Sequence, residues 1–218
     1  MLRHRWRLGF VILFCATAQA EEPVSQPFAQ AEPVVLPAEV PAKLAKASGE
    51  QPACIDLVER VGALCFRVPS DKGRRLVLDG DLAAAGLSAS VLRERATSRA
   101  GAELSKLGQV QGVRDLPRHR YWMVAGEPWS AAVLLDPKAM LARLPGDGPL
   151  LIGLPSVDVA VAWRSDGDEL DRVMMVALAK LHGAHEPSIT PLALRWDGSA
   201  WLVHGEAVRR DKEASTEP

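Results

Sequence analysis

The residues best suited to coordinate a metal ion lie close together near residue 185. His182, His185 and Glu186 provide two imidazoles and a carboxylate, which are ligand types that zinc accepts in proteins. With Asp158 as a further acidic group, they would support a metal-assisted hydrolase. The alternative is that a histidine in the last helical turn complements the helix dipole and that the other residues are ordinary surface. Because histidine spacing alone is a weak signal, we favour this second interpretation.

Asp158 follows Pro155-Ser156 at the start of an apolar stretch. A buried carboxylate there would need a partner and could have a shifted pKa, as active-site carboxylates do. We favour the other interpretation, in which an aspartate after a turn accepts backbone N–H groups. The sequence contains no Gly-x-Ser-x-Gly, no phosphate-binding loop, no dinucleotide fingerprint and no His-Glu-x-x-His. It therefore indicates no catalytic motif, and we expect no cofactor.

Tryptophan is the most prominent binding residue type in this chain, which has one tyrosine. Several tryptophans fall at expected strand positions, where a place in the core is the default interpretation. If Trp163, Trp196 and Trp201 share the open face of a sheet, they would form a docking surface, because tryptophan is enriched at binding hot spots. We regard this binding hypothesis as better supported than the hydrolase.

The stretch from Gly148 to Val203 would position all of these groups. It contains the clearest helix, whose apolar residues recur at i, i+3, i+4 and i+7: Leu170, Val173, Met174, Ala177, Leu178 and Leu181. Asp166 and Glu169 resemble a capping box, and Gly183 can close the last turn. These signals together predict a helix from about residue 166 to residue 183.

Alternation with a period of two predicts strands on both sides of this helix. One face before the helix carries Val157, Val159, Val161 and Trp163, and a second alternating run follows from Leu192 to Trp196. Asp197-Gly198 is a strong hairpin signal before Trp201-Leu202-Val203. We expect an antiparallel sheet of hairpins with the helix laid across one face.

In the region before Gly148, the sequence pattern predicts a second long helix and another strand. The helix starts at Ser88 or Ser90 and runs to about Leu107, and Trp129 to Leu135 reads as a strand. The expected fold class is α+β, with one domain in which two longer helices pack on an antiparallel sheet.

The N-terminus has the features of a secretory signal peptide. Residues 1–20 combine Arg3, Arg5 and Arg7 with a short apolar run, and Ala18-Gln19-Ala20 is a small-x-small cleavage site, so we expect cleavage after Ala20. Lipid anchoring at Cys15 is the less favoured alternative, because Phe14 stands where a lipobox needs a small residue. These features predict export to the periplasm or the extracellular space, with no membrane span after cleavage.

Composition divides the rest of the chain into three parts. Residues 21–52 are rich in proline and alanine and are expected to form a disordered linker. Residues 53–205 form the expected α+β domain, and residues 206–218 a polar tail. Cys54 and Cys65 are the two cysteines outside the signal peptide, so an oxidising compartment predicts a disulfide between them.

Charge argues against one class of partner. Removal of residues 1–20 takes away three arginines and no acid, which changes the formal net charge from −1 to −4. A mildly acidic chain is a poor candidate for nucleic-acid binding, and we expect no nucleic-acid partner.

The segment from Trp129 to Val203 resembles a bacterial domain family of unknown function. The resemblance rests on the expected strand Ser130–Leu135, Pro155-Ser156-Val157-Asp158, the long helix and the final hairpin. Such sequences often have a basic residue before the aspartate, where this chain has Val157. The resemblance implies no activity, so the leading hypothesis is an exported module that binds an envelope or extracellular protein. A structural accessory role without a dedicated ligand is the other open possibility.

Overall fold

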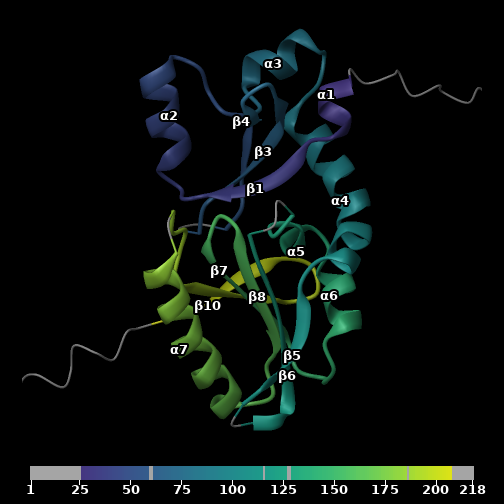
Figure 1. Cartoon of the computed structure of the whole chain (residues 1–218), viewed down its shortest axis with the longest axis vertical. Helices are drawn as coiled ribbons and strands as arrows, with labels where there is room; N and C mark the ends of the chain where they lie inside the picture. The colour runs from purple at the N-terminus through teal and green to yellow at the C-terminus, as the bar shows by residue number, and fades with distance from the viewer. Residues whose placement is uncertain (1–25, 59–60, 115, 127–128, 186, 208–218) are drawn as a thin grey trace, which may run out of the picture.

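The computed structural model describes residues 26–58, 61–114, 116–126, 129–185 and 187–207. Within these ranges the chain forms two antiparallel sheets, and helix α4 (Ala89–Lys106) runs alongside both of them (Figure 1). The α+β class predicted from sequence is confirmed. The strands, however, form two sheets, whereas the sequence suggested one.

The first sheet has four strands from the N-terminal part of the chain. Its strands are β1 (Glu32–Leu36), β2 (Cys54–Asp56), β3 (Ala63–Ser70) and β4 (Gly73–Leu76). The order is β1-β3-β2, and β4 pairs with the far end of β3. Three short helices belong to this region: α1 (Gln26–Ala29), α2 (Val40–Ser48) and α3 (Asp79–Ala84).

The prediction of a disordered linker is wrong for residues 26–52. Strand β1 lies in the sheet, and Val34 and Val35 on it are buried. Pro33 is tolerated because β1 is an edge strand, and Pro41 lies in the first turn of α2, where a missing N–H costs little. The prolines therefore occupy positions that an ordered structure allows. Residues 21–25 and the signal peptide with Ala20 and Cys15 lie outside the described residues.

The second sheet has six strands in the order β10-β9-β7-β8-β6-β5. They are β5 (Gln109–Val113), β6 (Leu116–Ala125), β7 (Leu150–Ser156), β8 (Val159–Arg164), β9 (Leu192–Trp196) and β10 (Trp201–Glu206). The predicted hairpins on both sides of the long helix are present: β7 pairs with β8, and β9 with β10. Ala207 is also buried, so the fold extends into the predicted tail, whose residues 208–218 lie outside the described part.

The long helix of the prediction is α7 (Asp168–Ala184), which packs on β7. Its apolar face covers one side of the second sheet, where Leu170, Met174 and Leu178 are buried. Its ends differ from the prediction: Gly167 is the N-cap residue without a side-chain cap, and the helix continues through Gly183. The second predicted helix is confirmed as α4, which Ser88 caps by accepting a hydrogen bond from the Val91 N–H.

The predicted strand Trp129–Leu135 is wrong. This segment forms a turn followed by α5 (Ala132–Leu135), and α6 (Pro137–Arg143) comes next, capped by Asp136. Ala132, Val133 and Leu134 are all buried between the two sheets, so burial on every side overrides the β propensity of the run.

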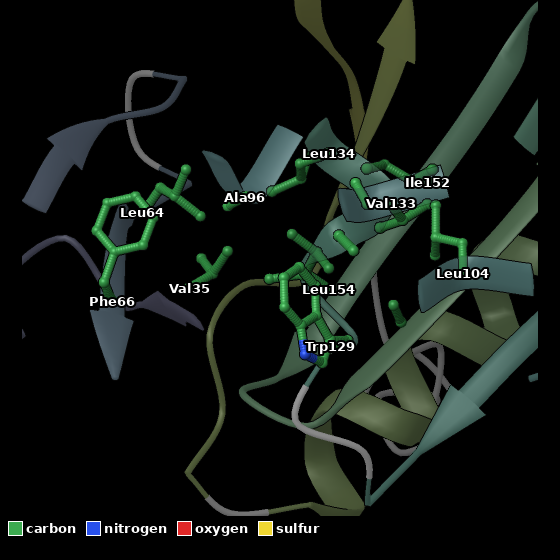
Figure 2. Close-up of a cluster of buried hydrophobic side chains, with 14 of the residues drawn as sticks. Val35, Leu64, Phe66, Ala96, Leu104, Trp129, Val133, Leu134, Ile152 and Leu154 are labelled. Carbon is green, nitrogen blue, oxygen red and sulfur yellow. The ribbon is translucent and has the colours of Figure 1, made fainter. Parts of the chain in front are cut away.

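One continuous core connects the two sheets. Figure 2 shows Leu64 and Phe66 from the first sheet approaching Ala96 of α4, with Leu134 and Ile152 beyond it. Since these side chains belong to a single buried cluster, the sheets fold around shared apolar contacts.

The predicted disulfide between Cys54 and Cys65 is confirmed. The two residues face each other across β2 and β3. The bridge lies on the opposite face of the first sheet from the main core, where Val157 packs against it.

Candidate functional site

The three tryptophans proposed as a docking surface do not share one face. Trp163 is completely buried under α7, and its Nε1 donates a hydrogen bond to Asp171 Oδ1 at 2.9 Å. Its assignment to a binding surface is therefore wrong, because the helix covers that face of the sheet. Trp196 and Trp201 lie on the other face and remain partly exposed.

Trp196 and Trp201 form a pair across the β9–β10 hairpin. They occupy directly opposite positions in the ladder, and their ring centroids lie 5.2 Å apart at an interplanar angle of 57°. Cross-strand neighbours are close enough for two aromatic rings to pack, and a tilted arrangement suits their charge distribution. The pair is therefore a direct product of the hairpin register.

The hairpin turn that sets this register is organised by Asp197. Its Oδ1 accepts hydrogen bonds from the backbone N–H groups of Ser199 at 2.8 Å and Ala200 at 2.7 Å. These hydrogen bonds, led by that of Ala200, lower the pKa of the Asp197 carboxyl. Gly198 adopts a φ of 108°, which a side chain would disfavour. The Asp-Gly signal in the sequence thus predicted this turn correctly.

Trp201 is fixed to the neighbouring helical segment. Its Nε1 donates a hydrogen bond to the Leu134 carbonyl at 3.0 Å, which orients the indole toward α5. A helix as short as α5 leaves its carbonyl groups without helical partners, so this acceptor is available. The contact joins positions 67 residues apart in the chain.

These tryptophans form one wall of a pocket of about 330 Å³. This volume lies within the range of small-molecule and cofactor sites, about 300–1,000 Å³. Four regions contribute: the end of β2, the exposed side of α4, the α5–α6 segment and the β9–β10 hairpin. The lining residues outside the hairpin are Asp56, Leu57, Val58, Arg93, Thr97, Leu134, Leu135 and Pro137.

We call this site the Trp196–Trp201 pocket; it offers two opposite charges beside its apolar walls. Arg93 projects from α4 and Asp56 lies at the end of β2, and both are exposed. Neither side chain forms an ion pair or a hydrogen bond with another residue in the described ranges. Both groups are therefore free to contact a ligand.

Sequence reasoning missed Asp56, Arg93 and Thr97. Arg93 and Thr97 are four apart in the predicted helix, which places them on one face. That signal was readable, but nothing in the sequence links this face to the C-terminal hairpin. Ser199 and Ala200 complete the pocket from the turn itself.

The described residues of the proposed metal site are not brought together with a third ligand. His182 lies in the last turn of α7, and its Nδ1 is 3.2 Å from the Pro155 carbonyl. His185 follows the helix with extended backbone angles, and Glu186 lies outside the described residues. No group of three or more His, Cys, Asp or Glu residues suited to a metal occurs in the described part of the chain. The three-residue metal site remains a prediction.

The turn Pro155–Asp158 connects β7 to β8 and is held from several sides. Ser156 Oγ donates a hydrogen bond to Asp158 Oδ1 at 2.8 Å, and the Asp158 carbonyl accepts one from the Gly126 N–H. Ser130 Oγ donates to the Val157 carbonyl at 3.2 Å. Asp158 therefore belongs to the turn, but its side-chain partner is the Ser156 hydroxyl, and acceptance of backbone N–H groups by its carboxylate stays a prediction. Val157 packs beside the disulfide, which explains an apolar residue at this position.

Comparison with known proteins provides no family. No family model matches the chain, and neither curated proteins nor solved structures yield a match. The resemblance of Trp129 to Val203 to a domain family of unknown function thus stays a hypothesis. Among the described residues, no helix has the length and apolar character needed to cross a membrane.

Proposed function

We propose that this protein is an exported, non-enzymatic binding module of the bacterial cell envelope. We further propose that a segment of a partner protein occupies the Trp196–Trp201 pocket. The observation that carries the proposal is the convergence of two partly exposed tryptophans with unpaired Arg93 and Asp56 around one hollow. Tryptophan and arginine are the residue types most enriched at binding hot spots.

The chemistry of the pocket favours binding over catalysis. Its described lining contains no histidine or cysteine, and Asp56 is its one carboxylate. The indole rings can pack against an apolar side chain of the partner, while Arg93 and Asp56 can fix the flanking polar groups. This division into an apolar anchor and a polar surround is common at protein interfaces.

Export is supported by the N-terminal sequence and by the disulfide. Residues 1–20 have the basic start, apolar run and cleavage site of a signal peptide. A bond between Cys54 and Cys65 is typical of proteins that mature in an oxidising compartment. Edman sequencing of the mature protein checks the proposed cleavage, which predicts Glu21 as the first residue.

Crosslinking in cells tests the binding proposal. A tagged full-length protein is crosslinked, captured from the envelope fraction and analysed by mass spectrometry. We expect one dominant partner, and we expect Trp196→Ala and Arg93→Ala to reduce its capture at least about tenfold, as for hot-spot residues. Arg93 is exposed, so its replacement tests the pocket with little risk to the fold.

Leu202→Ala is the matched control for this experiment. Leu202 is 42% exposed on the same hairpin, and it neighbours Trp201 but faces the opposite side of the sheet. Capture that persists in both pocket variants, or falls equally in Leu202→Ala, would contradict the proposal. Stoichiometric zinc that is lost in a His182→Ala, His185→Ala double variant would instead favour the hydrolase.

A further inference from the structure

A second hollow is lined by the β5–β6 hairpin, the loop before β7, the end of β8 and the start of α7. Figure 1 shows the β5–β6 hairpin and the start of α7 at the same end of the molecule. Its volume is about 110 Å³, well above the roughly 10–15 Å³ needed for one water molecule on the same measure. The lining residues are Arg118, His119, Arg120, Pro145, Gly146, Arg164, Asp166 and Leu170. The hollow thus brings three arginines from two different hairpins together.

We propose that this hollow, the Arg118–Arg164 site, binds an oxyanion of the phosphate type. The guanidinium group of arginine presents a planar fork of donors that matches phosphate oxygens. Three such groups at one small hollow create a strong positive potential, which an anion would relieve.

One carboxylate, that of Asp166, lies in the hollow against the three arginines. Asp166 is paired with the Nδ1 atom of His119. Nearby Asp171 accepts hydrogen bonds from Trp163 and from Ser165. Across the described ranges, Arg118 and Arg164 form no ion pair with any acidic residue. The site therefore carries excess positive charge.

Arg164 is the least satisfied of the three arginines. Its Nε atom is buried and has no hydrogen-bond partner within the described structure. A buried donor without a partner is rare in proteins and often indicates a missing water or ion. Arg120, by contrast, donates to the carbonyl groups of Pro117 and His119. Arg118 and Arg164 are thus the two groups left to hold a ligand.

Gly146 lines the hollow beside Arg164. A Cβ atom at this position would lie 3.5 Å from the Arg164 Cβ atom, which is an ordinary contact distance. The glycine also has a φ of 112°, in the region that disfavours side chains. The backbone conformation, rather than a lack of space, therefore favours glycine at this position.

Calorimetric titration of the mature full chain with inorganic phosphate, at constant ionic strength set with chloride, tests the site. We expect Arg164→Gln and Arg118→Gln each to weaken phosphate binding at least about tenfold. The reason is that one hydrogen bond to a charged group contributes more free energy than a tenfold change in affinity requires. Arg118 is exposed, so its variant tests the site even where Arg164→Gln lowers stability. Arg114→Gln, on the same hairpin and also exposed, is the control and should bind normally.

A second arm identifies the source of the phosphate group. Vesicles of phosphatidylglycerol are compared with vesicles of phosphatidylcholine in a flotation assay. One informative result is that the protein binds the anionic vesicles but not free phosphate, and that Arg118→Gln and Arg164→Gln each abolish this vesicle binding. That result would support the site and assign it to a lipid headgroup. If neither phosphate nor anionic vesicles bind, or if Arg114→Gln weakens binding as much as Arg118→Gln, the proposal is overturned.

Discussion

Burial separates the roles of tryptophans that look alike in the sequence. Trp163 donates a hydrogen bond inside the core beneath α7, whereas Trp196 lines a pocket. Trp163→Phe should lower the free energy of unfolding by about 2–4 kcal/mol, because it leaves a cavity and removes a hydrogen bond to a carboxylate. Trp196→Phe should cost about 1 kcal/mol or less. Urea denaturation followed by circular dichroism measures both, and equal losses would contradict this assignment.

The turn carboxylate Asp197 should make the pocket hairpin sensitive to acid. Its pKa is lowered from an ordinary value of 3.8 by backbone N–H groups of Ala200 and Ser199. A lowered folded pKa contributes stability that is present above the unfolded pKa and is lost as the pH falls through the folded pKa. Asp197→Asn should therefore reduce the melting temperature at pH 7, and the difference from the wild type should shrink as the pH falls below the ordinary aspartate pKa of 3.8.

Nuclear magnetic resonance of the Asp197 carboxyl provides the direct check of this prediction. A titration midpoint at or above 3.8 would contradict it. The control is Asp71, an exposed aspartate in the β3–β4 turn, whose replacement by asparagine should not change the melting temperature in the same way.

At the residue scale, Trp196 and Trp201 of the three tryptophans proposed for binding line the pocket, whereas Trp163 is buried. Trp163 and Trp196 both stand at alternating strand positions, so the period-two pattern treats them equally. The position of α7 alone decides which face of the sheet is covered, and this position depends on tertiary packing. Arg93 and Asp56 were missed for the same reason, since α4 and β2 meet the hairpin only in the folded chain.

At the element scale, α7 packs closely on the six-stranded sheet at Gly153 of β7. A Cβ atom at Gly153 of β7 would lie 2.5 Å from Leu178 Cδ1 and 3.2 Å from its Cγ. Gly153→Ala should therefore destabilise the protein by about 1–3 kcal/mol through overpacking. Urea denaturation measures this cost in the wild-type background.

A double-mutant cycle with Leu178→Ala isolates the contact. The smaller side chain leaves room for the new methyl group, so Gly153→Ala should cost close to nothing in that background. If the losses of unfolding free energy in Gly153→Ala and Leu178→Ala add up in the double variant, the α7–β7 packing differs from the structure described. Gly205→Ala on β10 is the control, because a Cβ atom there would lie 3.7 Å from Met175 Cε, an ordinary contact distance that should be tolerated better.

Element boundaries were predictable where several local signals agreed. The predicted start at Ser88 or Ser90 and the predicted end near Leu107 agree with the bounds of α4, and Asp197-Gly198 placed the last hairpin. The linker prediction failed because the position of a strand in the sheet decides whether proline is tolerated there. Pro33 signals an extended linker in isolation, but the edge of a sheet accepts a residue without an N–H.

At the scale of the whole molecule, the N-terminal segment is part of the fold. Phe28, Val34 and Val35 are buried, and β1 supplies one partner of β3. A variant that begins at Ala53 should lose cooperative unfolding, because each lost Val or Phe contributes about 1.5–3 kcal/mol against a total of about 5–15 kcal/mol. A variant that begins at Gln26 should unfold cooperatively. Thermal denaturation of both compares them, and full stability of the shorter variant would contradict this role.

Site-specific photocrosslinking in cells tests directly whether the Trp196–Trp201 pocket holds a partner protein. A photoreactive amino acid replaces Ser199 at the edge of the pocket, and Leu202 on the other face of the hairpin is the control position. We expect one crosslinked envelope protein from position 199. It should be absent from position 202 and lost when Arg93→Ala is added. Equal crosslinking from both positions, or none from position 199, would contradict this expectation.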